Sequence, residues 1–272
     1  MNARRALIVI RGGGDLGTGV AARLHRSGFG ILMLEIGEPL AVRRLVALAE
    51  AVYSGETTVE ELRGRRVESV EEAWGVIGAG DVPVMVDPKG ACMPDISPLG
   101  LIDARLRKAP NELGIKSAPF VVGLGPGFMA AIDCHAVVET QRGHHLSRVY
   151  WAGGAAPDTG RPEPVAGRGL ERVLRAPQAG VIRGIRALGE VVEAGDPVVA
   201  VNGDEIRAPF RGAVRGLLHD GLYVEAGAKV GDIDPRAEPR YCREISDKAL
   251  AVGGGALEAL LSNPEIRRHL GA

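Results

Sequence analysis

Residues 6–28 read ALIVIRGGGDLGTGVAARLHRSG, and this stretch decides the fold of the N-terminal half. Its first five residues form an unbroken apolar run, which is typical of a buried strand. Three glycines follow, and from Leu16 to Ser27 the apolar residues recur at helical spacing. Gly28 stands where a helix C-cap is expected. The stretch therefore predicts a strand, a glycine turn and a helix in succession.

The glycine turn has the spacing G-x-G-x-x-G through Gly12, Gly14 and Gly17. In dinucleotide-binding loops the first glycine permits the tight turn, the second lets a diphosphate approach the backbone, and the third lets the helix pack on the strand. Free N–H groups at the helix N-terminus attract the phosphates. Gly13 and Asp15 complete the loop, and the Asp15 carboxylate would weaken anion binding. A tight turn without any ligand is the alternative.

A second apolar strand is predicted at residues 31–36, and a helix opened by Pro39 at residues 40–51. A right-handed crossover would make the first two strands parallel. Glu35 ends the second strand, 18 residues beyond Gly17, where such loops place a carboxylate that accepts the ribose hydroxyls. Because this charge would repel a 2′-phosphate, NAD or an adenosine ligand is favoured over NADP.

Two further strands are predicted at residues 82–86 and 120–124, with a helix at residues 98–108 between them. After the second of these strands, Gly125 and Gly127 flank Pro126 in another glycine loop, whose backbone N–H groups could bind an anion. A turn that requires positive φ is the alternative.

The densest group of polar side chains lies within twelve residues and comprises Asp133, His135, Glu139, Arg142 and His144. Side chains alternate along a strand, so Asp133, His135 and Glu139 are expected on one face, with Cys134 buried on the other. A histidine beside a carboxylate is a common acid–base pair. These five residues are therefore the candidate catalytic set, with the polar outer face of an edge strand as the alternative.

The last hundred residues contain an internal repeat. Residues 175–198 align with residues 207–230 without a gap, and 12 of the 24 pairs are identical. Each copy is expected to form short strands separated by glycine turns, and the two copies to interlock about a pseudo-two-fold axis. The pattern resembles the barrel-sandwich hybrid of biotinyl and lipoyl carrier domains. No lysine lies between Lys116 and Lys229, so covalent biotin or lipoate is excluded and a structural or docking module is expected.

These patterns predict an α/β chain with three parts. The first two parts are separated by the loop rich in glycine, proline and alanine that ends near residue 169. Residues 1–152 are expected to form a Rossmann-like parallel-sheet domain, and residues 170–235 an all-β, lipoyl-like barrel-sandwich hybrid. Residues 240–272 are expected to form a helical segment that packs on the first domain. Three glycines at 253–255 each cost about 1 kcal/mol inside a helix. Close packing there is favoured over contact with a ligand.

The composition excludes several classes of protein. The chain has 33 Lys and Arg against 34 Asp and Glu, so no basic field favours nucleic acid or a membrane surface. The longest apolar run, residues 118–132, is interrupted by glycines and a proline and is too short to span a bilayer. No signal peptide is evident. Cys92, Cys134 and Cys242 lack metal-site spacing and are expected as free thiols, so no metal and a cytoplasmic location are expected.

Distinctive strings occur along nearly the whole chain, at residues 11–19, 25–28, 33–43, 123–128, 133–144, 245–249 and 253–255. They resemble the YqeB-type accessory proteins of selenium-dependent molybdenum hydroxylases. The N-terminal part is similar to XdhC-type xanthine dehydrogenase accessory factors, which have a Rossmann-like domain and handle molybdenum cofactor. The resemblance implies a role in maturing a molybdenum hydroxylase, by delivering or modifying its cofactor.

Three functions remain open from the sequence. The first is an accessory protein that binds NAD, a related nucleotide or molybdopterin cytosine dinucleotide on Gly12, Gly14 and Gly17 and docks on a client hydroxylase. The second is an NAD-dependent oxidoreductase with His135 as its acid–base group. The third is a scaffold in which neither glycine loop binds a ligand. The sequence does not decide whether the chain is an enzyme, whether it forms a homo-oligomer, or whether it handles selenium.

Overall fold

The computed structural model describes residues 6–106, 113–160 and 164–270. The chain divides into two compact units, which are described separately below. The first unit consists of Met1–Pro39, Leu48–Asp158 and Ile245–Ala272, and the second of Leu40–Ala47 and Thr159–Glu244.

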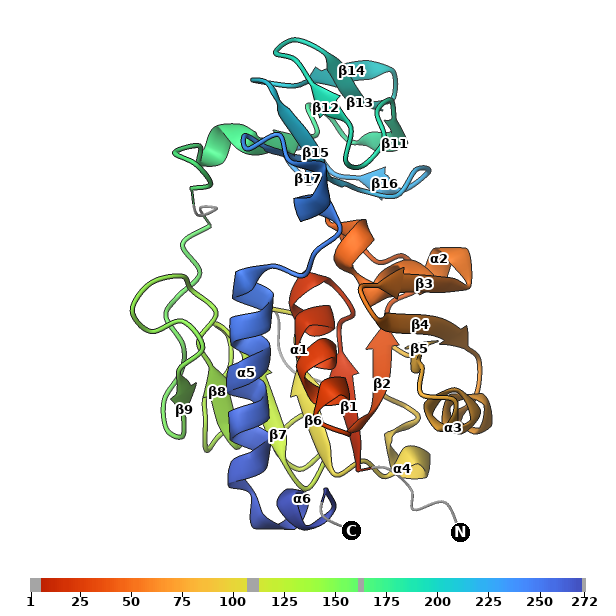
Figure 1. Ribbon diagram of the computed structural model, residues 1–272, viewed down its shortest axis with the longest axis vertical. Coiled ribbons are helices and arrows are strands. Elements are labelled where there is room, and N and C mark those ends of the chain that lie inside the picture. The colour runs from red at the N-terminus through yellow and green to blue at the C-terminus, as the bar shows by residue number, and fades with distance from the viewer. Residues whose placement is uncertain (1–5, 107–112, 161–163, 271–272) are drawn as a thin grey trace. The chain divides into compact units, whose positions relative to one another are not determined.

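A nine-stranded mixed sheet forms the centre of the first unit (Figure 1). Its strands are β1 (Leu7–Arg11), β2 (Gly30–Glu35), β3 (Glu56–Val59), β4 (Leu62–Val67), β5 (Val82–Val86), β6 (Gly100–Asp103), β7 (Val121–Leu124), β8 (Ala136–Val138) and β9 (Val149–Tyr150). Their order is β3-β4-β5-β2-β1-β6-β7-β8-β9. The strands from β4 to β8 are parallel to their neighbours, whereas β3 and β9 run antiparallel at the two edges.

The helices of this unit are α1 (Asp15–Arg26), α2 (Ala51–Ser54), α3 (Val70–Gly78), α4 (Met93–Ile96), α5 (Asp247–Ser262) and α6 (Pro264–Arg268), with a 3₁₀ turn at Leu48–Glu50. Ser69 caps α3 by accepting from Glu72 N, and Ser246 caps α5 by accepting from Ala249 N. In the described part of the chain, no helix has both the length and the hydropathy needed to cross a bilayer.

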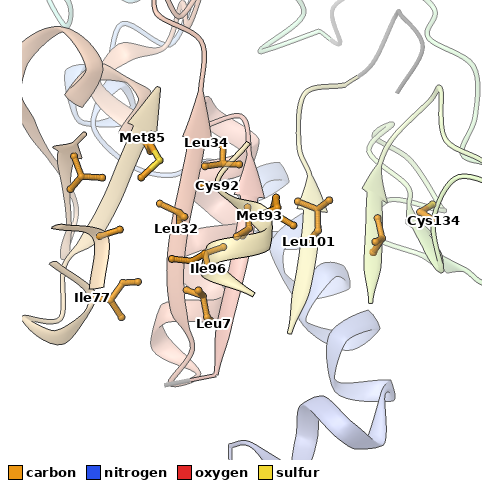
Figure 2. Close-up of a cluster of buried hydrophobic side chains, with 14 of the residues drawn as sticks. Leu7, Leu32, Leu34, Ile77, Met85, Cys92, Met93, Ile96, Leu101 and Cys134 are labelled. Carbon is orange, nitrogen blue, oxygen red and sulfur yellow. The ribbon is translucent and has the colours of Figure 1, made fainter. Parts of the chain in front are cut away.

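Apolar side chains from alternate strand positions form the core on the sheet face toward α3 and α4 (Figure 2). Leu7 of β1, Leu32 and Leu34 of β2 and Leu101 of β6 are each at most 3% exposed. They meet Ile77 of α3 in one cluster. Burial of each such side chain contributes about 1.5–3 kcal/mol, which explains why these short apolar runs become central strands.

Glycines allow α1 and α5 to approach at backbone distance. A Cβ on Gly253 would lie 2.6 Å from Gly19 O, and a Cβ on Gly19 would lie 2.6 Å from Ala249 O. The helix α5 runs unbroken through its three glycines. Close packing therefore accounts for Gly253 and also for Gly255, where a Cβ would lie 2.5 Å from Ser147 O, but not for Gly254, which has open space beside it.

The second unit contains two four-stranded antiparallel sheets. One has the order β10-β17-β15-β12 and the other β14-β13-β11-β16. The strands are β10 (Val173–Arg175), β11 (Gly180–Gly184), β12 (Val191–Val192), β13 (Pro197–Val201), β14 (Asp204–Arg207), β15 (Gly212–Leu217), β16 (Tyr223–Val224) and β17 (Lys229–Asp234). The first repeat supplies β10 to β13 and the second β14 to β17, so each sheet takes two strands from each copy and the copies interlock.

The predicted fold class is wrong as stated. The first unit has a mixed sheet instead of a parallel Rossmann-like sheet, because Glu60, at a positive φ of 52°, turns the chain into the antiparallel β3–β4 hairpin. The second unit has two separate antiparallel sheets and no clear lipoyl-like barrel-sandwich hybrid. The repeat indicates which strands are equivalent, but a strand pattern does not specify how sheets close.

Two predicted helices are also wrong. Gly100–Asp103 forms β6, because a run this short, with only Leu101 and Ile102 apolar, fits either period and a buried parallel position between β1 and β7 selects the strand. In residues 40–51 only 3₁₀ turns form before α2, including one at Arg44–Val46. There, Val42 O accepts from Leu217 N at 2.8 Å, which ties this segment to β15.

The glycines of α5 provide a matched test of its packing. We expect Gly253→Ala to lower the free energy of unfolding by about 1–3 kcal/mol, because the new methyl group collides with the Gly19 carbonyl. Gly254→Ala has nothing within 4 Å of its new Cβ and should instead raise stability by up to about 1 kcal/mol. Urea denaturation measures both changes. Equal effects of the two substitutions would contradict the packing account.

Candidate functional site

The candidate site lies at the carboxyl ends of the parallel strands, where β1 runs into the loop Gly12–Gly14 and α1 begins at Asp15. Strand β1 lies between β2 and β6. From β2 the sheet continues to β5, β4 and β3, and from β6 it continues in the opposite direction to β7, β8 and β9. Ligands of open α/β sheets bind at the carboxyl edge beside such a point of reversal. The glycine loop therefore occupies the position where this fold type places a ligand.

The fold itself requires Gly12 and Gly17. Gly12 has a φ of +93°, which favours glycine, and its N donates to Leu34 O at 2.9 Å. A Cβ on Gly17 would overlap Gly12 O. The turn geometry thus explains both glycines without a ligand. This agrees with the alternative that the loop is only a tight βα turn.

Gly13 links the glycine loop to Glu35, Ala49 and Thr18 through hydrogen bonds of its backbone. Its N donates to Glu35 Oε1 at 2.6 Å, and its O accepts from Ala49 N at 2.9 Å and from Thr18 Oγ1 at 3.1 Å. A Cβ on Gly13 would lie 3.0 Å from Ala49 N. This amide is therefore engaged by the protein and is not directed at a ligand.

Gly14 differs from these three glycines. Its φ is −68° and its ψ −171°, which any residue adopts, and no atom lies within 4 Å of the position of a Cβ. Gly14 is the N-cap of α1, and no side chain caps this end of the helix. Asp15 occupies the first turn, where its carboxylate interacts favourably with the helix dipole. Neither backbone conformation nor packing explains the glycine at position 14.

Glu35, at the end of β2, joins that strand to the glycine loop. Its Oε1 accepts from Gly13 N at 2.6 Å and its Oε2 accepts from Ile36 N at 2.9 Å. Burial raises the pKa of the Glu35 carboxyl, against the two backbone hydrogen bonds and Arg105, which lower it. Each oxygen retains a second lone pair, so the carboxylate can still accept a hydroxyl hydrogen.

An arginine that the sequence analysis did not identify borders the other side of the loop. Arg105 donates to Asp103 through Nε at 2.9 Å and through Nη2 at 2.7 Å, and its Cγ lies 3.1 Å from the position of a Cβ on Gly12. The same Asp103 pairs with the buried Arg11 at 3.5 Å. The signal was the string Asp103-Ala104-Arg105, which was assigned to a helix and therefore not placed at the sheet edge.

The second glycine loop is packed against its own unit. Gly125 and Gly127 have φ values of +73° and +90°, so both adopt a conformation that favours glycine. Gly125 N donates to Val138 O at 2.8 Å, and a Cβ on Gly125 would lie 2.5 Å from Thr140 Oγ1. The turn geometry accounts for both glycines, and the predicted anion binding there stays a prediction.

The predicted polar cluster is divided between two edges of the sheet. Asp133 and His135 precede β8, so they lie at the amino edge, opposite the glycine loop. His135 Nδ1 accepts from Val121 N at 3.0 Å and its ring stacks on Phe120, while Asp133 accepts from Met129 N at 2.9 Å. Burial lowers the pKa of His135. The shared strand face expected for these residues does not form, because β8 begins only at Ala136.

The other members of the cluster follow β8 and have separate partners. Glu139 is buried and accepts from Thr140 N, Gln141 N and Ala156 N, each at 2.8 Å. Arg142 forms a bidentate ion pair with Asp247 at the start of α5, and His144 stacks edge-on with His145. The structure thus does not bring the five residues together, and their catalytic roles stay untested predictions.

Possible metal ligands and the cysteines were located within the described residues. No group of three or more His, Cys, Asp or Glu side chains in that part of the chain could hold a metal ion. All three cysteines are buried and free. Burial and the nearby Asp87 raise the pKa of Cys92 to about 12, and burial raises that of Cys134 to about 11.

The thiols should therefore be inert in the native protein. At pH 8 a thiol with a pKa near 12 is ionised to roughly one part in ten thousand, and only the thiolate reacts. We expect no modification of Cys92, Cys134 or Cys242 by iodoacetamide in the folded chain, and modification of all three in urea. Intact-mass spectrometry distinguishes these results, and rapid native labelling of Cys92 would contradict them.

The raised pKa of Glu35 predicts a specific dependence of stability on pH. The folded state holds the Glu35 proton more tightly than the unfolded state, so this residue's contribution is largest at low pH. It declines as the pH rises from about 4.3, the ordinary value for Glu, through the folded pKa. Relative to Glu35→Gln, which does not titrate, the natural chain should lose stability over this window. Urea unfolding of both proteins across this range tests it, and parallel pH profiles would exclude it.

No protein-family model matches the chain. A search of curated proteins finds a relative from Escherichia coli K12 named "Uncharacterized protein YqeB". The two sequences are 48% identical over 257 residues, which are 94% of this chain and 47% of the relative. The chain therefore spans about half the length of the curated protein it matches.

Three solved structures are similar at low scores. An aspartoacylase family protein from Mesorhizobium loti covers 84% of both chains with a TM-score of 0.26 and 11% identity. A succinylglutamate desuccinylase/aspartoacylase from Rhodobacter sphaeroides covers 85% of this chain and 86% of its own, with a TM-score of 0.27 and 12% identity. An ectoine utilization protein from Ruegeria pomeroyi has the same coverage, a TM-score of 0.24 and 11% identity.

The comparisons give no support to the expected maturation role. The name of the curated relative mentions neither molybdenum hydroxylase maturation, nor an XdhC-type factor, nor a lipoyl-like module. The expected maturation role is therefore not carried further. What the comparison shows is similarity to YqeB at 48% identity, over the half of that relative which the chain spans.

Proposed function

We propose that the first unit binds a nucleotide with a diphosphate group, such as NAD or a related dinucleotide, at the loop between β1 and α1. The observation that carries this proposal is Gly14. Its backbone conformation suits any residue and the space beside it is open, yet the position holds glycine. A diphosphate that must approach the backbone closely explains a glycine that the fold does not need.

The helix behind Gly14 provides the attraction. The first N–H groups of an α-helix have no partner within the helix, and the helix dipole places partial positive charge there. Because no side chain caps α1, a phosphate oxygen can take the place of the cap. The Asp15 carboxylate opposes this attraction and favours a ligand held by several contacts over a lone phosphate ion.

The two residues flanking the loop fit the remainder of such a ligand. Glu35 has lone pairs available for ribose hydroxyls and is already oriented by Gly13 N and Ile36 N. Arg105, held in plane by Asp103, supplies a guanidinium beside Gly12. A guanidinium fork suits phosphate oxygens. Since NAD and molybdopterin cytosine dinucleotide share the diphosphate, both belong in the binding test.

The geometry gives less support to the oxidoreductase alternative. A nucleotide on the loop lies at the carboxyl edge of the sheet. His135 lies at the amino edge, so the lengths of strands β7 and β8 separate the two positions. An acid–base group must lie within hydrogen-bonding distance of the reacting atoms. His135 therefore does not serve a ligand bound at Gly14, and the proposal is limited to nucleotide binding.

Substitution of Gly14 by aspartate or asparagine provides the decisive test. Both side chains are good N-caps, so both variants should equal or slightly exceed the natural chain in thermal stability. Gly14→Asp places a negative charge at the diphosphate and should weaken NAD binding by about 100-fold or more. The nearly isosteric Gly14→Asn should weaken it less. Gly75→Asn, at another glycine with open space beside it, should leave the affinity unchanged.

Isothermal titration calorimetry with NAD, NADP, ADP and molybdopterin cytosine dinucleotide measures these affinities. NADP should bind more weakly than NAD because Glu35 repels the 2′-phosphate, and Glu35→Gln should reduce that difference. If none of the four ligands binds the natural chain, the loop is a structural turn and the scaffold alternative is correct.

A further inference from the structure

We propose that Asn202 of the second unit is a site of spontaneous deamidation, and that the packing of its side chain on β11 controls when the reaction occurs. The backbone nitrogen of Gly203 attacks Cγ of Asn202. The side-chain nitrogen then leaves as ammonia, together with the proton of the attacking nitrogen, and a cyclic imide remains. Water opens the imide at either of its carbonyl carbons, which gives aspartate or isoaspartate, so the reaction needs no other reactant.

The sequence distinguishes Asn202 from the other asparagines of the chain. Asn2, Asn111, Asn202 and Asn263 are followed by alanine, glutamate, glycine and proline respectively. Glycine has no Cβ that would hinder attack by its nitrogen. Proline has no backbone N–H, so Asn263 does not react by this route. Asn202 therefore has the highest intrinsic reactivity.

Asn202 and Gly203 form the exposed tip of the hairpin between β13 and β14. Val201 pairs with Asp204, so the connection has only two residues, and their φ values are +48° and +93°. Two-residue hairpin turns with both φ values positive favour Asn followed by Gly. The turn geometry thus accounts for this pair of residues, and their chemical reactivity is a consequence of how the strands are joined.

The folded hairpin holds the Asn202 carboxamide against β11 and the residue before it. Its Oδ1 accepts from Val181 N at 2.9 Å, and its Nδ2 donates to Ala179 O at 3.4 Å. A Cβ on Gly180 would lie 2.4 Å from Asn202 Cγ, so the carboxamide packs directly on the Gly180 backbone. While these contacts last, Cγ is not free to turn toward Gly203 N. Deamidation therefore requires the hairpin tip to open.

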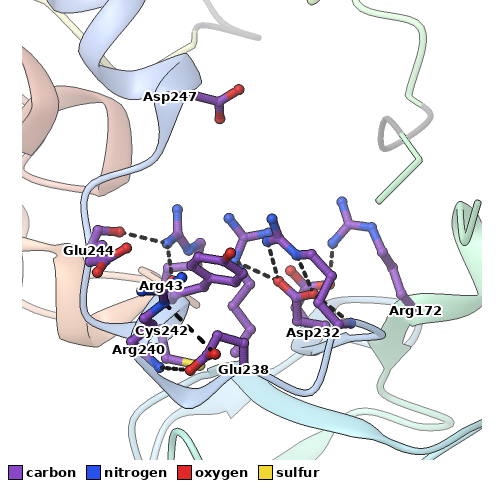
Figure 3. A network of polar contacts seen from close by, with 12 residues as sticks. Arg43, Arg172, Asp232, Glu238, Arg240, Cys242, Glu244 and Asp247 are labelled. Atoms are coloured by element: carbon purple, nitrogen blue, oxygen red, sulfur yellow. Dashed lines mark hydrogen bonds and ion pairs between the residues drawn. The ribbon is translucent and has the colours of Figure 1, made fainter. Parts of the chain in front are cut away.

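The second copy of the repeat lacks the reactive pair. At the offset of 32, the equivalent residues are Asp234 and Pro235. A carboxylate has no amide to lose, and proline has no N–H to attack with. Charged groups are found on this strand instead, where Asp232 pairs with Arg172 (Figure 3). The first copy thus uses a neutral side chain that can be converted, at a position where the second copy has an inert one.

Conversion removes a contact that holds the hairpin. A carboxylate at position 202 still accepts from Val181 N, but it does not donate to Ala179 O, so two acceptors face each other. It also adds negative charge two residues before Asp204. Isoaspartate adds one atom to the backbone of a two-residue turn, which is incompatible with the pairing of Val201 and Asp204. Either product should therefore loosen β14.

The strand order makes this loosening consequential. Strand β14 is at the edge of its sheet, and its neighbour β13 is buried from Val198 to Val201. Loss of β14 would leave the apolar β13 with an unpaired edge, which is a template for aggregation. Deamidation at Asn202 therefore gives the second unit a limited lifetime, because each opening of the hairpin tip allows an irreversible change.

Ageing of the intact 272-residue chain at mildly alkaline pH, with and without urea, tests the proposal, with the products located by peptide mapping and mass spectrometry. A slow reaction of the open form follows the population of that form. Conversion at Asn202 should therefore be about tenfold or more faster in urea than in the native chain. In urea, Gly203→Ala should slow it by about tenfold, because the new Cβ hinders the attacking nitrogen.

Two substitutions in β11 separate the packing of Asn202 from general weakening of the strand. Gly180→Ala places a Cβ 2.4 Å from Asn202 Cγ and displaces the carboxamide. Native deamidation should then be about threefold or more faster, with an unchanged rate in urea. Gly184→Ala is the matched control, since its Cβ would meet side-chain atoms of Asp220 and Leu217 first. It should leave the rate at Asn202 unchanged.

Asn202→Asp reproduces one product and tests its effect on the hairpin. Amide hydrogen exchange in β14 should be about threefold or more faster than in the natural chain, because the hairpin opens more often. Exchange in β17 should stay the same. Equal exchange of β14 in the two proteins would show that the amide of Asn202 does not hold the hairpin.

Three results would overturn the proposed control of deamidation. Equal rates at Asn202 in the native and the urea-unfolded chain would show that the fold gives no protection. Conversion in urea that is no faster at Asn202 than at Asn111 would remove the site. An unchanged native rate in Gly180→Ala would remove the role of packing on β11, and should this variant fail to fold, the natural chain with and without urea still decides. None of these results depends on nucleotide binding at Gly14.

Discussion

Backbone-to-backbone packing around α1 is the constraint on which the first unit depends. On one side Gly17 fits against the carbonyl of Gly12, and on the other Gly19 fits against α5. Side chains at either position would push the helix away from β1 or from α5. With both contacts made, the N-terminus of α1 points along the carboxyl end of β1, at the place where the sheet reverses direction. The candidate site exists because this helix cannot lie elsewhere.

Sequence reasoning was most successful where local chemistry and tertiary structure agree. The unit β1–loop–α1 could be predicted because an apolar run, three glycines and helical spacing all indicate the same structure. It failed at residues 98–108, because a run as short as that of β6 fits a helix or a strand and only the neighbours of β6 decide between them. It also joined Asp133, His135 and Glu139 by alternation, although β8 separates the first two from the third. Arg105 was missed for the same reason as β6.

For the second unit, the repeat predicted that the two copies interlock but not how the sheets are arranged. Identity between the copies correctly indicated interlocking strands, since each sheet draws on both copies. It did not indicate how the sheets close, because that depends on side chains at the ends of the strands. The differences between the copies were more informative than the identities. The positions Lys229, Asp232 and Asp234 have no charged counterparts in the first copy, and in the second copy Asp232 pairs with Arg172 and Asp234 with Arg236.

The central claim is that the amide groups around Gly14 receive a diphosphate. The most direct measurement is a ¹⁵N–¹H correlation spectrum of the chain titrated with NAD, in which each backbone amide reports its own environment. The account predicts that the largest shifts are those of Gly14, Asp15 and Leu16, with smaller shifts at Ile36 and Arg105. Shifts confined to other parts of the chain, or a spectrum that NAD leaves unchanged, would contradict it.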